Sequence, residues 1–171
     1  FLTVNASGKI AMKLDNDDAI VGVKICRDDQ DILLNTKLGK CIRFESKKLR
    51  VFKGRSSKGI RGLNLSADDK VVSLSIIDNI KIMKIVKNRE DKSELIAKQK
   101  FILSISENGY GKKTQLDDFP IHNRGGQGVI SIKTSERNGQ MVAATLVEEE
   151  DGIMLISDKG TMIRTNVSQV P

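Results

Sequence analysis

The stretch DILLNTKLGKCIRF, residues 31–44, contains an apolar run, a small hydroxyl residue, a glycine three positions later and a second strand-like run. The same pattern returns in KFILSISENGYGKKT, residues 100–114, and in DGIMLISDKGTMIRT, residues 151–165. The three copies align at Gly39, Gly109 and Gly160. A strand, a tight turn that ends at glycine and a returning strand are typical of a β-hairpin. The sequence therefore predicts three hairpins.

A second unit alternates with these hairpins. It reads SGKIAMKLDNDDAIVGV (7–23), KGIRGLNLSADDKVVSL (58–74) and QGVISIKTSERNGQMVAATL (127–146). Each copy predicts a glycine, a strand, a polar turn and another strand. One hairpin and one such unit give four strands, which is the number in a propeller blade. Because the repeats begin and end in mid-unit, we expect neighbouring units to exchange strands to complete each blade.

The spacing of the glycines sets the length of the repeat. Gly8 and Gly59 are 51 residues apart, as are Gly109 and Gly160, whereas Gly39 and Gly109 are 70 apart. We assign the excess of about 19 residues to an insertion at about 76–99. The remainder corresponds to about three repeats, and no long helical pattern is present. We predict one all-β, propeller-like unit over residues 1–171, which forms an open arc because three repeats are too few to close a ring.

Composition favours a polyanionic partner. Lys and Arg total 29 against 22 acidic residues, for a net charge of +7 and a pI near 9.4. No apolar run is long enough to cross a bilayer and no signal peptide pattern is present, so we predict no membrane partner and a cytoplasmic location. Two cysteines, Cys26 and Cys41, give no disulfide framework. Since the chain opens with Phe1, we expect a fragment.

Positive charge is concentrated in KLGKCIRFESKKLRVFKGRSSKGIR, residues 37–61, which has ten basic residues and one acidic residue. Such a run is typical of a track for backbone phosphates that does not read bases. The alternative is a solvated basic loop. The few aromatic residues argue against stacking of single strands, so the predicted partner is duplex DNA. The predicted DNA-binding residues of this run are Arg43, Lys47, Lys48, Arg50, Lys53, Arg55, Lys58 and Arg61, and those of the later repeats are Lys112, Lys113, Arg124, Lys133 and Arg164.

No constellation in the sequence supports catalysis. Tyr110, the only tyrosine, sits between two glycines with no neighbouring base or acidic cluster. The GYGKKT stretch lacks the spacing of a phosphate-binding loop. His122 and the two cysteines do not have the spacing of zinc ligands. We therefore predict no catalytic residue, no metal and no cofactor, and a packed rather than a reactive Cys41.

Several motifs resemble one known family. NGYGKKT (108–114), RGGQGVISIKTSERNG (124–139), KGIRGLNLSADDKVVSL (58–74) and GIMLISDKGTMIRTNVSQV (152–170) are similar to the C-terminal domain of the bacterial DNA gyrase A subunit. The likeness covers nearly the whole chain apart from the insertion. It implies a β-pinwheel, a propeller-like disc that wraps DNA around a basic rim to support negative supercoiling. It also implies a non-catalytic role, with the gyrase B subunit plus the rest of the gyrase A subunit as partners.

The chain departs from that family at its signature box, QRRGGKG. The nearest stretch, HNRGGQG (122–128), keeps Arg124, Gly125, Gly126 and Gly128 but lacks the leading Gln, one Arg and the Lys. We expect it to be a degenerate copy and the full box to precede Phe1. Two alternatives remain: the equivalent domain of topoisomerase IV, and a propeller that binds protein through its insertion.

Overall fold

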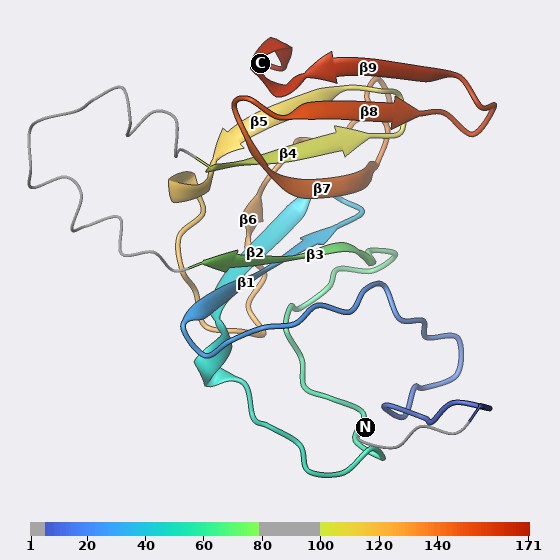
Figure 1. The fold of residues 1–171 in the computed structure, drawn as a ribbon, viewed down its shortest axis with the longest axis vertical. Helices are drawn as coiled ribbons and strands as arrows, with labels where there is room; N and C mark the ends of the chain where they lie inside the picture. The colour runs from blue at the N-terminus through green and yellow to red at the C-terminus, as the bar shows by residue number, and fades with distance from the viewer. Residues whose placement is uncertain (1–5, 79–99) are drawn as a thin grey trace, which may run out of the picture.

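The computed structural model describes residues 6–78 and 100–171 (Figure 1). Nine strands form three antiparallel sheets within these residues, and the only helices there are 3-10 turns of three residues. The all-β prediction is confirmed. The sheets follow one another along the long axis, with the first described residues and the C-terminus at opposite ends of the molecule, so the described repeats do not close into a ring (Figure 1).

All three predicted hairpins form. They are β1 (Gln30–Thr36) with β2 (Lys40–Glu45), β4 (Lys100–Ser106) with β5 (Gly111–Gln115), and β8 (Gly152–Ile156) with β9 (Met162–Asn166). The aligned glycines end the turns at φ of +81° for Gly39, +79° for Gly109 and +80° for Gly160, a left-handed conformation that favours glycine. Each hairpin is followed by a 3-10 turn: η1 (Ser46–Lys48), η3 (Leu116–Asp118) and η4 (Val167–Gln169).

The first sheet is a complete blade made from two repeats. Its strand order is β3-β1-β2-β6, where β3 is Val71–Asp78 and β6 is Val129–Ile130. β6 comes from the repeat that contains β4 and β5, and it pairs through Lys40 with Ile130 and Cys41 with Val129. This exchange confirms that a neighbouring unit completes the blade. The second sheet has the order β5-β4-β7, with β7 at Met141–Glu148.

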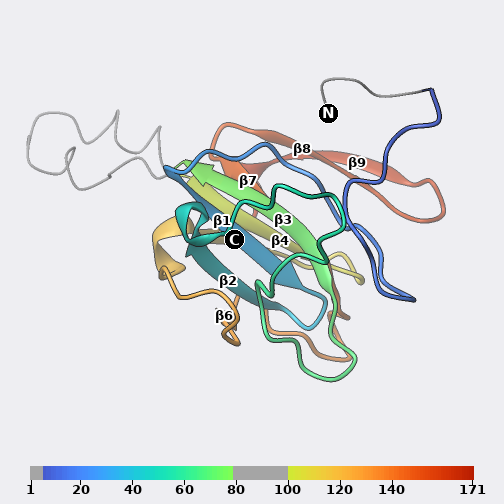
Figure 2. The same cartoon turned by 90° about the horizontal axis from the view of Figure 1, so that it is seen from below.

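The blades pack face to face, and this explains why the strands are apolar on both sides. Leu33 of β1 and Ile102 of β4 meet in a core between the first two blades. The next residue in β4, Leu103, points to the other face, where it packs with Val167 of the third blade. Full burial of one such side chain contributes about 1.5–3 kcal/mol. β3 also packs beside β7, so these two edge strands adjoin (Figures 1 and 2).

Three strands that were expected in the second type of unit do not form. Residues 6–29 contain no strand, although two were expected in 7–23, and within 58–74 only the start of β3 is a strand. The pairing of β6 gives the reason. β6 follows Gly128 and pairs with β2, which belongs to the hairpin of the repeat before its own. The segments after Gly8 and Gly59 have no such partner in the described residues, because no hairpin precedes Gln30 there. An extended segment without a neighbour cannot form the ladder bonds of a strand.

The insertion predicted at about 76–99 overlaps the end of β3. Residues 76–78 belong to β3, and Ile77 is fully buried in the core between the first two blades. Residues 79–99 lie outside the described part of the chain. The insertion there, and the treatment of 1–171 as one fragment of a larger pinwheel, therefore stay predictions.

Candidate nucleic-acid interface

Most of the basic residues predicted to hold DNA are exposed. The two exceptions are Arg43, which is buried, and Lys113, which is half-buried. The exposed members are Lys47, Lys48, Arg50, Lys53, Arg55, Lys58, Arg61, Lys112, Arg124, Lys133 and Arg164. Exposure leaves these side chains accessible to a polyanion, and their positions in the fold decide which of them could act together.

Two repeats build one basic cluster, which we call the basic junction: Lys47, Lys48, Arg61 and Arg124. Lys48 Nζ donates to Asn123 Oδ1 at 3.3 Å, and Arg124 Nη1 donates to the carbonyl oxygen of Arg61 at 3.2 Å. These contacts join η1 and the loop after it to the loop that precedes β6. Residues 47 and 124 are far apart in the sequence, so the fold brings together cations that the sequence places in separate runs.

The backbone of the RGG loop fixes this arrangement. The amide of Gly125 donates to the carbonyl of Gly62 at 2.6 Å, and the amide of Asn64 donates to the carbonyl of Gly126 at 2.8 Å. Gly125 has a φ of +81°, which side chains rarely allow. The loop is thus held by main-chain bonds, which leaves the Arg61 and Arg124 side chains at the surface.

Glu45 orders the two lysines of the basic junction. Its carboxylate lies 2.7 Å from Lys47 Nζ and 3.0 Å from Lys48 Nζ. Hydrogen bonds from these two lysines hold the pKa of Glu45 below its ordinary value. Both lysines are exposed, and exposed ion pairs are weak because water screens them. A phosphate can therefore replace Glu45 as the partner of either lysine at low cost.

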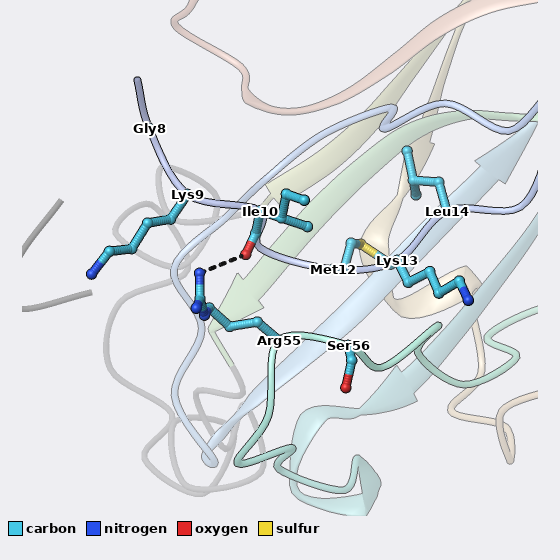
Figure 3. A pocket seen from close by; sticks show the side chains of 8 residues that line it. All are labelled: Gly8, Lys9, Ile10, Met12, Lys13, Leu14, Arg55 and Ser56. Atoms are coloured by element: carbon cyan, nitrogen blue, oxygen red, sulfur yellow. Dashed lines mark hydrogen bonds between the residues drawn. The ribbon is translucent and has the colours of Figure 1, made fainter. Parts of the chain in front are cut away.

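A second group of basic residues lies beside an open cavity of about 880 Å³ between the stretch near Gly8 and the loop at Arg55 (Figure 3). Arg55 reaches across this gap and donates to the carbonyl oxygen of Ile10 at 3.4 Å, whereas Lys13 points away from that contact (Figure 3). Lys58 forms an ion pair with Asp15. Arg50 lies over the ring of Phe52 at 5.5 Å. This group extends the positive surface of 37–61 but is held by fewer contacts than the basic junction.

A third group includes a residue that sequence reasoning missed. Lys133 and Arg137 line a cavity of about 400 Å³ beside Tyr110. Arg137 lies over the Tyr110 ring at 5.2 Å, and its Nε donates to the phenol oxygen at 3.1 Å. Lys112 reaches the same segment through the carbonyl of Ser131 at 3.5 Å. Arg137 falls in the SERNG turn quoted above, so the polar turn of the second unit at 127–146 was the signal that could have found it.

The prediction for Arg43 is wrong. Its side chain is 9% exposed, and Nη2 lies 2.9 Å from the fully buried Asp31 carboxylate. Lys113 is also engaged, because its ammonium, 14% exposed as a side chain, contacts both oxygens of Glu149 at 2.9 Å. Each side chain packs against the next blade, where it reaches the 3-10 turn that follows the next hairpin. We therefore exclude both residues from the proposed DNA surface.

The two cysteines differ in burial, and this predicts a difference in reactivity. Cys41 is fully buried, and burial raises the pKa of its thiol to about 12, whereas Cys26 is exposed. Since the thiolate is the nucleophile, an alkylating reagent at about pH 8 should modify Cys26 alone in the folded chain and both cysteines after denaturation. Intact mass before and after denaturation measures this. Modification of Cys41 in the folded chain at the rate of Cys26 would contradict the packing of β2.

Neither a cluster of metal-ligating side chains nor a helix that could span a membrane occurs within residues 6–78 and 100–171. No group of three His, Cys, Asp or Glu side chains there could hold a metal ion. None of the helices in the same residues is long and apolar enough to cross a membrane.

A protein family matches most of the chain. The family described as DNA gyrase C-terminal domain, beta-propeller, matches residues 4–27, 30–78, 100–148 and 153–171. These segments cover most of the chain. The second and third coincide with the two blades that begin at β1 and β4, and the residues between them are the stretch 79–99.

Individual relatives agree with this family. The chain is 41% identical to the DNA gyrase A subunit of Haemophilus influenzae, 38% to that of Salmonella typhimurium and 34% to that of Rickettsia bellii, over 99% of its length in each case. It spans about a fifth of these relatives, at 20%, 17% and 22% of their lengths.

Two solved structures share the fold. The C-terminal domain of DNA gyrase A superposes with a TM-score of 0.76 at 26% identity, covering 95% of this chain and 49% of that one. The C-terminal domain of DNA topoisomerase IV gives the same TM-score at 22% identity, covering 94% and 44%. At this identity, the similarity to the topoisomerase IV domain supports a shared fold and nothing more.

Proposed function

Because the chain belongs to the DNA gyrase C-terminal domain family, a β-propeller family, we propose that it binds and wraps duplex DNA in support of supercoiling by a gyrase. In this proposal the chain is a non-catalytic part of a type II topoisomerase. In the bacterial cytoplasm its partners are duplex DNA, the B subunit of a gyrase and the rest of the A subunit. The relatives that are gyrase A subunits, which are several times longer than this chain, support that setting.

The basic junction is the observation that carries the proposal. Its four cations come from two repeats and converge where the loop before β6 meets η1, with backbone bonds that fix the loop. Lys and Arg side chains spaced along a curved array of blades suit the phosphates of a bent duplex, because they neutralise charge and release counterions. The proposed contacts are to phosphates and not to base edges, so the proposed binding tolerates any sequence.

The competing function is a propeller that binds a protein. The basic side chains exposed at the basic junction favour a polyanion over a protein partner at that surface. The equivalent domain of topoisomerase IV is the nearer alternative and shares the DNA-binding chemistry. The relatives named above are gyrase A subunits, so we retain the gyrase hypothesis.

A salt titration tests the proposal. About five or six phosphate contacts should give a slope of log affinity against log salt near −5 for duplexes of unrelated sequence. Fluorescence anisotropy with two labelled duplexes of equal length and different sequence measures the slope. Binding that is independent of salt would argue for a protein partner instead. A large preference for one duplex would show base readout, which contradicts the proposed phosphate track.

A further inference from the structure

One basic position recurs in all three hairpins. Arg43, Lys113 and Arg164 each follow the hairpin glycine by four residues, on β2, β5 and β9. The register is also the same, because these residues lie opposite Leu33, Leu103 and Met154 on the preceding strand. The three side chains are therefore equivalent by position, and their different surroundings show what this position does.

In the first blade the cation binds the second blade. Arg43 Nε donates to Asp31 Oδ2 at 2.9 Å within its own hairpin. Its Nη1 donates to the carbonyl oxygens of Leu116 at 3.2 Å and Phe119 at 3.4 Å, at η3 of the next repeat. The backbone joins the same two repeats, since the amide of His122 donates to the carbonyl of Arg43 at 2.7 Å.

In the second blade the cation binds the third blade in the same way. Lys113 Nζ lies 3.4 Å from the carbonyl oxygen of Val167, the first residue of η4. Leu116 and Val167 are equivalent, since each begins a 3-10 turn seven residues after its hairpin glycine, and both are buried. The backbone again joins the repeats, because the amide of Lys113 donates to the carbonyl of Pro171 at 2.8 Å. Glu149 neutralises this ammonium as Asp31 neutralises Arg43.

We propose that Arg43 and Lys113 are positioning residues that clasp each blade to the next and so set the curve along which DNA is held. The proposal rests on the proposed DNA-wrapping function. The physical reason is that a charged donor to a buried carbonyl is strong and directional where water is excluded. Because each cation is matched by a carboxylate, the clasp fixes the angle between blades without presenting charge to DNA. Phosphates are held elsewhere, by the exposed cations of the basic junction.

Arg164 provides the matched control. It occupies the same register as Lys113, but it is exposed, and its side chain donates no hydrogen bond to another blade within the described residues. Lys113→Met keeps the apolar stem and removes the donor without stranding a buried charge, since the Glu149 side chain is 37% exposed. Arg164→Met likewise replaces a cation by methionine, at a position that clasps no described blade.

The first experiment uses the 171-residue chain without DNA. Spin labels are placed on native Cys26, which is exposed beside the first blade, and on Asp158→Cys in the turn of the third blade. Lys113→Met should make the distance distribution between the labels about twofold broader, whereas Arg164→Met should leave it unchanged. An unchanged distribution in folded Lys113→Met overturns the proposal, whatever the chain does with DNA.

The second experiment separates positioning from contact with phosphate. The chain is bound to relaxed closed circular DNA, nicking and closing are allowed, and the trapped change in linking number is measured. Lys113→Met should reduce the trapped change by about half while the salt slope for a short duplex stays the same, because no phosphate contact is lost. A slope that flattens by about one, with the trapped change intact, would instead make Lys113 a phosphate contact and overturn the proposal. If the parent chain traps no change at all, the wrapping function fails, and the spin labels still decide the clasp.

A double variant tests the clasp between the first and second blades. Arg43→Met alone would leave Asp31 buried without its guanidinium and could unfold the chain, so Asp31→Leu is added. Replacing a buried ion pair by apolar residues is often neutral for stability, yet it removes the donor to Leu116 and Phe119. We expect the folded double variant to broaden the label distances as Lys113→Met does. A folded double variant with unchanged distances would contradict the clasp at the first junction.

Discussion

Replacing Gly39 by alanine should lower the free energy of unfolding by roughly 3 kcal/mol or more, because two penalties coincide there. Gly39 has a φ of +81°, and a Cβ at this position would lie 2.1 Å from the carbonyl oxygen of Ile132. That atom is backbone, so it cannot move aside as a flexible side chain would. The amides of Ser131 and Ile132 also donate to the carbonyl of Gly39, at 2.8 and 3.3 Å. Relief of the clash would therefore break the contact between two repeats.

Gly109 is the matched control, because it has the same place in the next hairpin and a φ of +79°, but a Cβ there would meet nothing within 4 Å. Gly109→Ala should cost only the left-handed backbone penalty, about 1–2 kcal/mol. Urea denaturation of both variants measures the difference. Equal losses would mean that turn conformation alone matters and that the close approach of the two repeats carries no stability.

Removing three of the four positive charges of the basic junction should weaken duplex binding by roughly 10–100-fold at about 0.1 M salt. The variant is Lys48→Gln, Arg61→Gln and Arg124→Gln together, and glutamine keeps much of each side chain's length and polarity. Three lost phosphate contacts should flatten the salt slope by about three. All three side chains are exposed, so folding should be little affected, which circular dichroism checks.

The control removes the same charge elsewhere: Lys24→Gln, Lys70→Gln and Lys159→Gln. Lys24 lies beside β3 and β7, at the sheet edges opposite β6 and β5, and all three lysines are exposed. This variant should lose less than about threefold in affinity, since it changes only the overall field. Equal losses from the two variants would show diffuse attraction to a basic protein, with no defined path for DNA.

The hairpins could be predicted because local signals determine them. A glycine with positive φ, a small hydroxyl residue three positions earlier and two apolar runs are sufficient, and they recur three times. The strands of the second unit could not be predicted in the same way, since they form only against another hairpin. Residues 129–130 pair with β2 and form a strand, whereas the equivalent residues after Gly8 do not form one.

Arg43 shows that a run of basic residues does not predict which of the side chains are exposed. Counting cations over residues 37–61 treats them alike, but alternate residues of a strand face opposite sides. Arg43 lies two residues after Cys41, which was expected to be packed, so both share a face. The same alternation places Lys113 on the inner face and leaves Lys112 exposed. The basic junction could not be predicted from strand alternation, because it depends on the proximity of residues 48 and 123 in space.

The exchange of β6 also has a consequence for synthesis on the ribosome. Val129 follows the end of β2 at Glu45 by 84 residues, so the outer edge of β2 stays unpaired while the second hairpin is being made. An unpaired edge is the part of a nascent sheet that attaches to other chains, and lysine side chains are one means of discouraging this. Lys40 lies on that strand, with Lys47 and Lys48 directly after it. We therefore expect the positive charge around β2 to discourage aggregation of the nascent chain before any DNA is bound.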